Sequence, residues 1–212
     1  MPGVYLLVVA TFCCGVAFGA LIMLHFRKKR EKIRVNDGHY RSRAWALRSL
    51  LNNAGPRSLC LIGDSNIEWM PAFQLDDRPI VNAGMAGAKA TDCLRALQEV
   101  ELDAFPETTV LLIGTNDAIL GTEIEKFASA YRDILSQILG WKSRTIVVAI
   151  PPIETAVASP DLVNKAIHQE AISAGCEYID PFINAKMPMT HDGYHLNIGG
   201  MKRFRETIFD IL

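Results

Sequence analysis

The chain has 212 residues, of which 50% are hydrophobic and 21% are charged. This composition is typical of a globular protein with one well-packed domain, and it excludes a disordered, collagen-like or low-complexity protein. Five cysteines without a regular spacing exclude a small domain held by disulfides. Residues 1–34 hold six Lys or Arg against one Glu, whereas the rest of the chain holds 16 basic and 22 acidic residues. Because nucleic-acid affinity depends on clustered cations, we expect no nucleic-acid partner.

The first feature in chain order is an uncharged stretch of 21 residues from Val4 to Leu24. A helix of this length spans about 30 Å, which is the thickness of the hydrocarbon core of a bilayer. We therefore expect a transmembrane helix at residues 4–26 that binds the chain to a membrane. A cleaved signal peptide is the alternative, but such peptides begin with a positive segment and have a shorter apolar run.

A basic segment follows the apolar stretch, with Lys or Arg at six of the positions 27–34. Positive residues close to a membrane span favour the cytoplasmic side, so we expect the main domain in the cytoplasm, with a periplasmic or extracellular location as the alternative. Residues 27–56 are expected to form a basic flank and linker that contains a short helix around residues 42–52. Residues 57–212 are expected to form one domain.

Short apolar runs and helix-length segments alternate after residue 57. The runs predict five strands: Ser58–Ile62, Pro79–Asn82, Thr109–Ile113, Thr145–Ile150 and Glu177–Ile179. The segments between and after them predict four helices: Thr91–Val100, Glu123–Leu139, Pro160–Ala174 and Ile198–Leu212. Strands that are apolar on both faces and separated by helices predict a five-stranded parallel sheet in a three-layer α/β/α sandwich.

Polar clusters follow three of these strands and precede the last helix, at residues 61–66, 82–87, 113–117 and 191–197. In open parallel sheets, ligands bind at the carboxyl ends of the strands. Each cluster alone could be an ordinary turn or helix cap, because Gly, Asp, Ser, Thr and Asn favour such positions. Their order along the chain and their shared edge of the sheet indicate a functional site.

The residue types in these clusters match the requirements of nucleophilic catalysis. A serine such as Ser65 needs a base to become a nucleophile, and His195 can serve as that base. Asp192 lies three residues before His195, so it can fix the tautomer of the imidazole and stabilise its protonated form. The backbone N–H of Ser65, the N–H of a loop glycine and the side-chain amide of Asn116 are candidate donors to an oxyanion.

These motifs resemble those of the SGNH hydrolase superfamily, also called GDSL-type esterases and lipases, across residues 57–212. The first motif resembles Gly63-Asp64-Ser65, which implies Ser65 as the nucleophile and the first oxyanion donor. The second is a glycine after the second strand, and the spacing from Asn82 matches Gly87 better than Gly84. The third and the last motifs resemble Gly114-Thr115-Asn116-Asp117 and Asp192-Gly193-Tyr194-His195. The resemblance implies Asn116 as the third donor, and Asp192 and His195 as the other members of a catalytic triad.

The chain departs from this pattern after the nucleophile, where many relatives have Ile or Leu and then Thr but this sequence has Asn66-Ile67-Glu68-Trp69. Either residues 68–70 line the pocket, or Trp69 and Met70 are buried under the first helix. Asp64 is expected to cap that helix, and Asp117 to support the Asn116 loop.

No cofactor is expected, since the sequence shows no phosphate-binding loop and no cluster with metal-ligand spacing. His191 is given no direct role.

The expected function is that of a membrane-anchored serine esterase, which hydrolyses a carboxylic ester or a thioester through an acyl-serine intermediate. The substrate is expected to be a small-molecule or lipid ester. Two alternatives stay open: an acyltransferase that uses the same triad, and a non-catalytic binding module tethered to the membrane. Short connecting segments favour an open site, and the sequence does not indicate an oligomeric state.

Overall fold

The computed structural model describes residues 38–46, 48–50, 52–53, 55–71, 78–100, 105–154, 156–185 and 188–212. The predicted transmembrane helix at residues 4–26 and the basic segment at 27–34 lie outside these ranges. Within them, the structure contains no helix with the length and apolar character needed to cross a membrane.

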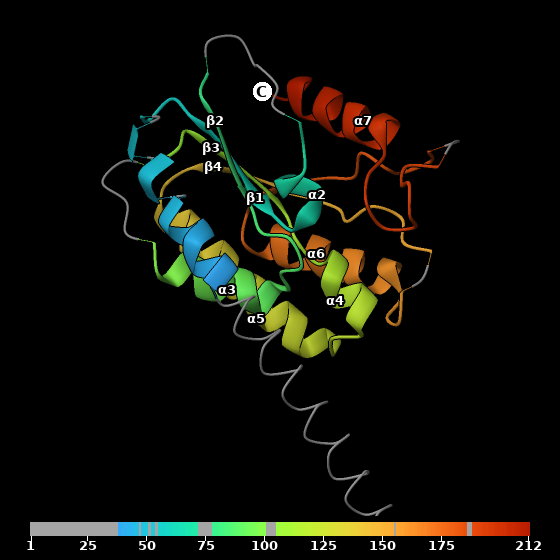
Figure 1. The fold of residues 1–212 in the computed structure, drawn as a ribbon. Helices are drawn as coiled ribbons and strands as arrows, with labels where there is room; N and C mark the ends of the chain where they lie inside the picture. The colour runs from blue at the N-terminus through green and yellow to red at the C-terminus, as the bar shows by residue number, and fades with distance from the viewer. Residues whose placement is uncertain are drawn as a thin grey trace, which may run out of the picture. The chain divides into compact units, whose positions relative to one another are not determined.

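Five parallel strands form a single sheet, as predicted, and the structure gives their order as β2-β1-β3-β4-β5 (Figure 1). The strands are β1 (Leu59–Gly63), β2 (Ile80–Gly84), β3 (Thr108–Leu112), β4 (Arg144–Val148) and β5 (Glu177–Ile179). In the register, Gly63 at the end of β1 lies opposite both Gly84 of β2 and Leu112 of β3. The three predicted motifs that follow these strands therefore start from one edge of the sheet.

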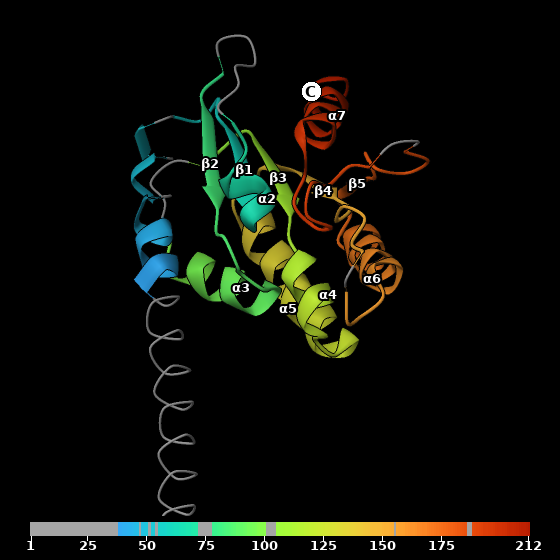
Figure 2. The same cartoon turned by 45° about the vertical axis from the view of Figure 1, so that its right-hand side comes forward.

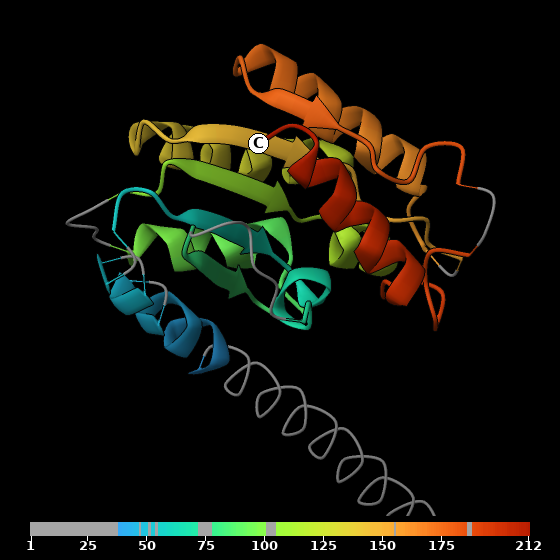
Figure 3. The same cartoon turned by 90° about the horizontal axis from the view of Figure 1, so that it is seen from above.

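Helices cover both faces of the sheet. They are α2 (Ser65–Glu68), α3 (Ala90–Gln98), α4 (Thr115–Leu120), α5 (Ile124–Gly140), α6 (Pro160–Ser173) and α7 (Ile198–Phe209). Apolar residues of α3, α5 and α6 pack against one face, and those of α2 and α7 pack against the other. Figure 3 shows α7 (red) in front of the strands and α5 behind them, and Figure 2 shows the same separation from the side.

The strands contribute to both halves of the core because successive side chains point to opposite faces. In β1, Leu59 and Leu61 pack with α7, whereas Cys60 and Ile62 pack with α3 and α5. The three described cysteines are free and buried, at residues 60, 93 and 176. The predicted three-layer arrangement is therefore confirmed within the described residues.

The compact unit that carries the sheet begins at Tyr40, well before the boundary expected at residue 57. Residues 38–46 are helical, and Tyr40 and Ala44 are buried in the core on the α3 side. Arg43 donates hydrogen bonds from Nε to the carbonyl of Gly84 at 2.7 Å and from Nη2 to that of Asn82 at 2.8 Å. This part of the expected linker thus packs with the domain, because its apolar side chains fill the core and its arginine holds the end of β2.

Candidate active site

The predicted nucleophile lies at the first position of α2, directly after β1. Asp64 caps this helix, as predicted, since its Oδ1 accepts a hydrogen bond from the backbone N–H of Asn66 at 2.9 Å. Asp64 is fully buried, and this burial raises the pKa of its carboxyl group, although the hydrogen bond from Asn66 opposes the shift. The turn leaves Ser65 only 4% exposed, so its hydroxyl is largely shielded from water.

The loop before α7 brings Asp192 and His195 to the same place. The loop is closed at its base, where the backbone N–H of His191 donates to the carbonyl of His195 at 2.9 Å. Within it, Nδ1 of His195 lies 2.6 Å from Oδ2 of Asp192, and Nε2 of His195 lies 2.9 Å from Oγ of Ser65. The three side chains therefore form a continuous hydrogen-bonded chain, which can move a proton from the serine hydroxyl to the imidazole.

The carboxylate of Asp192 is held in its ionised form. Desolvation acts to raise its pKa, but the backbone and ring N–H groups of His195 and the backbone N–H of Tyr194 outweigh it and lower the pKa to about 2. Oδ1 accepts the N–H of His195 at 2.8 Å, which leaves Oδ2 for the ring. An ionised Asp192 places the imidazole proton on Nδ1, and Nε2 is then free to accept the proton of Ser65.

Two backbone amides and one side-chain amide are available to bind an oxyanion. The N–H of Ser65 is at the first turn of α2, where helix amides lack partners within the helix. Gly87 has φ = +77°, in the left-handed region that favours glycine, and no N–H bond from it to another described residue is found. Asn116 donates from Nδ2 to the carbonyl of Ala88 at 2.9 Å, which fixes the orientation of its amide and leaves the second N–H of this group for a ligand.

Gly84 and Gly87 have different structural roles. A Cβ atom on Gly84 would lie 2.0 Å from the backbone nitrogen of Glu68, so glycine is needed there for close packing of β2 against α2. A Cβ atom on Gly87 would meet only the hydroxyl of Tyr40, at 3.8 Å. Gly87 therefore lies in open space, whereas Gly84 is packed against α2, and the assignment of Gly87 as an oxyanion donor stays a prediction.

Asn66 connects the nucleophile turn to the histidine loop, a role that the sequence analysis missed. This side chain is 1% exposed, and its Oδ1 accepts a hydrogen bond from the backbone N–H of Leu196, next to His195, at 2.8 Å. Its Nδ2 lies at longer range, 3.4 Å from both the hydroxyl of Thr115 and the carbonyl of Tyr194. The signal in the sequence was the departure from the family pattern at this position.

The residues after Asn66 divide between the site and the core. The ring of Trp69 lies 4.4 Å from the ring of His195 and is 53% exposed, so it forms part of the wall of the site. Met70 is buried in the core on the α7 side. Glu68 accepts a hydrogen bond from the backbone N–H of Ala86, so it supports the loop that carries Gly87.

Asp117 is expected from the sequence to support the Asn116 loop, and its side chain binds the start of α3, where its Oδ2 accepts the backbone N–H of Ala90 at 2.8 Å. Desolvation raises the pKa of its carboxyl group, and the hydrogen bond from Ala90 opposes that shift.

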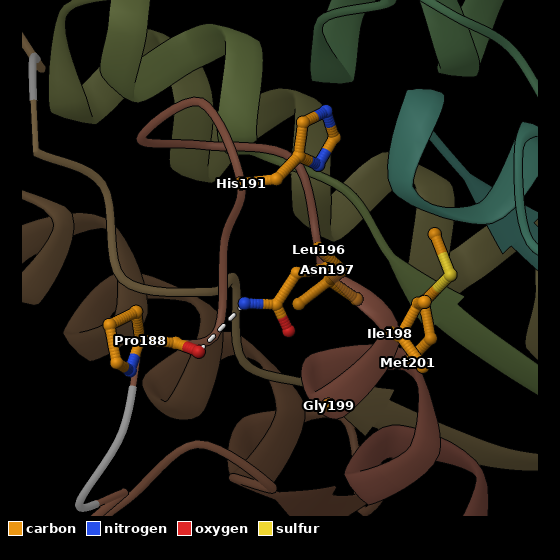
Figure 4. Close-up of a pocket in the computed structure, with 7 residues that line it drawn as sticks. All are labelled: Pro188, His191, Leu196, Asn197, Ile198, Gly199 and Met201. Atoms are coloured by element: carbon orange, nitrogen blue, oxygen red, sulfur yellow. Dashed lines mark hydrogen bonds between the residues drawn. The ribbon is translucent and has the colours of Figure 1, made fainter.

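A pocket of about 580 Å³ lies beside the histidine loop. It is lined mainly by apolar residues of the loop and of the start of α7: Pro188, His191, Leu196, Asn197, Ile198, Gly199 and Met201. Figure 4 shows His191 at one end of the pocket, with Ile198 and Met201 together on one side. The hydrogen bond from Nδ2 of Asn197 to the carbonyl of Pro188, at 2.8 Å, holds the opposite wall.

The structure also brings together three groups that can bind a metal, although the sequence analysis expected none. The ligand atoms of His191, Asp192 and His195 all lie within 4.8 Å of one another. The sequence pattern does not indicate this cluster, because the three residues lie in a loop, where the closed turn rather than a helix or strand repeat brings them together.

Comparisons with known proteins agree with this geometry. The model of the GDSL-like lipase/acylhydrolase family matches residues 61–203, and no match is found among curated proteins. A Streptococcus pneumonia protein, provisionally described as a platelet activating factor, has 20% identity and a TM-score of 0.71 over 91% of this chain and 98% of its own.

Two further solved structures share the fold at lower coverage. The lipase/acylhydrolase from Enterococcus faecalis has 19% identity and a TM-score of 0.59, over 73% of this chain and 94% of its own. The esterase EstA from Pseudoalteromonas sp., which is inhibited by monoethylphosphonate, has 16% identity and a TM-score of 0.56, over 72% and 95%. At these identities the likeness shows the fold, and the family model, which matches most of the chain, shows the family. The chain belongs to the GDSL-like lipase/acylhydrolase family and is a serine hydrolase that acts on carboxylic esters.

Proposed function

We propose that this protein is a membrane-anchored esterase that works through an acyl-serine intermediate, with Ser65 as nucleophile, His195 as base and Asp192 as the acid partner of the base. The observation that carries the proposal is the continuous chain of hydrogen bonds from Asp192 through His195 to Ser65, at 2.6 and 2.9 Å. Both distances are short enough for proton transfer, and the bonds join the groups in the required order.

The reaction proceeds in two halves. In the first, Oγ of Ser65 attacks the ester carbonyl while Nε2 of His195 accepts the hydroxyl proton, and the same proton then passes to the leaving alcohol. In the second, Nε2 takes a proton from water, the hydroxide attacks the acyl-serine, and the proton returns to Oγ as the acid leaves. The amides of Ser65, Gly87 and Asn116 stabilise the oxyanion in both halves.

We assign the apolar part of the ester to the pocket beside the histidine loop. The His191 end of this pocket adjoins the site, because the ring of His191 stacks on that of His195 with centroids 5.8 Å apart. Ile198 is 87% exposed, so its side chain is available to an apolar group that enters the pocket. A volume of about 580 Å³ is in the range of small-molecule sites.

The hydrolysis of chromogenic esters from acetyl to palmitoyl tests the reaction and the assignment of the pocket. We expect activity in the full-length chain in detergent, none in Ser65→Ala, and covalent labelling of Ser65 by an ethyl phosphonate probe. Ile198→Asp should lower kcat/KM for longer esters and leave acetyl ester hydrolysis unchanged. Ile172→Asp, at an exposed isoleucine on α6, is the matched control. Failure of the probe to label Ser65 would support a non-catalytic binding module, and labelling without hydrolysis would support an acyltransferase.

The membrane anchor is a second part of the proposal, supported by the 21 uncharged residues from Val4 to Leu24 and by the basic segment after them. We expect the full chain to stay in the membrane fraction after an alkaline wash. The substitution Val16→Arg, near the centre of the span, should make membrane insertion of the helix less favourable by about 2.5–3.5 kcal/mol and release protein from the membrane fraction. Protection of a C-terminal tag from external protease would support the cytoplasmic location, and digestion of the tag in intact cells would contradict it.

A further inference from the structure

We infer that His191, Asp192 and His195 form a binding site for Zn²⁺ or a similar transition-metal cation, and that binding there switches the enzyme off. The inhibition rests on the proposed role of His195 as the base, whereas the binding rests on the geometry alone. Two imidazoles and one carboxylate are ligands that Zn²⁺ commonly takes in proteins, usually with a water molecule as the fourth ligand.

The distances between the three groups are close to those of a zinc site. Nε2 of His191 lies 3.8 Å from Oδ2 of Asp192, and Nδ1 of His195 lies 2.6 Å from the same oxygen. Ligands about 2.0–2.2 Å from a tetrahedral zinc ion lie roughly 3.3 Å apart. The first pair must therefore close by about 0.5 Å and the second must open by about 0.7 Å. The ligand nitrogens of the two histidines lie within 4.8 Å of each other and must reach the same spacing.

The site is open to a cation from solution. The side chain of His191 is 56% exposed and that of Asp192 is 34% exposed, and His191 lines the pocket at the start of α7. Oδ1 of Asp192 accepts hydrogen bonds from the backbone N–H groups of Tyr194 and His195, at 3.2 and 2.8 Å, which leaves Oδ2 to bind the cation. The site thus combines an oriented carboxylate oxygen with an accessible imidazole.

Occupation of the site would remove the base function of His195. A cation bound at Nδ1 takes the lone pair on that nitrogen, so the proton of the neutral imidazole must reside on Nε2. Nε2 would then donate to Oγ of Ser65 instead of accepting its proton. The serine could then not be activated.

Direct binding and inhibition can be measured separately. Zinc binding is measured by competition with a chromophoric chelator, using the full-length Ser65→Ala chain in detergent, in which no turnover occurs. Inhibition of ester hydrolysis is measured in chains that keep Ser65, as a fraction of the zinc-free rate of each variant. The variants are His191→Ala and, as the matched control, His168→Ala, at an exposed histidine on α6 that packs on Tyr178.

We expect micromolar zinc to inhibit the wild type and His168→Ala equally and a chelator to restore both. His191→Ala should need at least about tenfold more zinc, since it has lost one of three ligands, and should bind zinc correspondingly more weakly in the Ser65→Ala background. Equal inhibition of wild type and His191→Ala, or zinc binding that His191→Ala does not weaken, would overturn the inference. A failure of the proposed esterase function is recognised separately, because the zinc-free chain would then be inactive while the binding assay is unaffected.

Discussion

The buried amide of Asn66 offers the sharpest test of how the site is held together. Asn66→Ala would remove the Oδ1 acceptor that binds the backbone N–H of Leu196 at 2.8 Å. Leu196 is 1% exposed, so its N–H would have no water to replace the lost acceptor. Because Leu196 follows His195 directly, the change should displace the imidazole from Ser65.

The magnitude follows from the contacts. One well-formed buried hydrogen bond is lost and one buried N–H is left without an acceptor, which should lower the free energy of unfolding by about 1–3 kcal/mol. The bonds from Nδ2 are at the long limit, 3.3–3.4 Å, and contribute little more. For a domain of this size we expect Tm to fall by about 2–4 °C per kcal/mol. The histidine loop keeps its closing hydrogen bond from the backbone N–H of His191 to the carbonyl of His195, so it stays folded. Each 1.4 kcal/mol of transition-state stabilisation that is lost when the base is misoriented should lower kcat about tenfold.

Thermal unfolding and ester kinetics on the same preparations measure both effects. Ile138→Val, in the buried part of α5 on the opposite face of the sheet, is a control for simple destabilisation and should cost about 0.5–1.5 kcal/mol. Asn66→Ala should lower kcat with little change in KM, while Ile138→Val should change neither at 25 °C. If Asn66→Ala lost stability but kept kcat within twofold of wild type, the reasoning that Asn66 positions His195 would be refuted.

Three further predictions follow from the geometry. Asn116→Ala should lower kcat by about 10²–10³, the usual loss for one oxyanion donor, and near-normal rates would remove Asn116 from the oxyanion hole. Gly84→Ala should prevent folding or greatly lower Tm, because the added Cβ would meet the backbone of Glu68. Gly87→Ala should cost about 1–2 kcal/mol of backbone strain and still fold. Similar Tm values for the two variants would contradict this difference. The pKa of Asp192 is lowered to about 2, so its carboxylate stabilises the fold above its unfolded pKa of about 3.9, and this stabilisation is lost as the pH falls through 2. Between these two pH values, the stability of Asp192→Asn should depend less steeply on pH than that of the wild type, as measured by circular dichroism. Equal slopes would contradict the lowered pKa.

The sequence was sufficient for the sheet, for most of the helices and for the members of the proposed triad. Buried parallel strands carry apolar residues on both faces, so their positions can be read from short runs such as Thr108–Leu112. The motif around Ser65 and the four residues from Asp192 to His195 are local in sequence. Their meeting follows from the rule that ligands bind at the carboxyl ends of parallel strands.

The features that the sequence did not reveal depend on contacts between distant residues. The short helix α4 has only six residues, too few for a helical repeat to be recognised. The hydrogen bond from Leu196 to Asn66 joins residues that are 130 positions apart, so no local sequence pattern predicts it. The residue type of Trp69 is compatible with either a buried or an exposed side chain. The packing of α2 on β2 determines that this side chain is exposed.

The contact from Arg43 to the end of β2 limits how far this chain can be shortened from its N-terminal side. The family model begins at residue 61, and a shortened chain cut there would keep every residue of the proposed triad. It would nevertheless leave the carbonyls of Asn82 and Gly84 without the guanidinium that binds them, three residues before Gly87. The segment around Arg43 therefore supports the end of β2 from which the Gly87 loop starts, and a shortened chain on a different tether should begin no later than Tyr40.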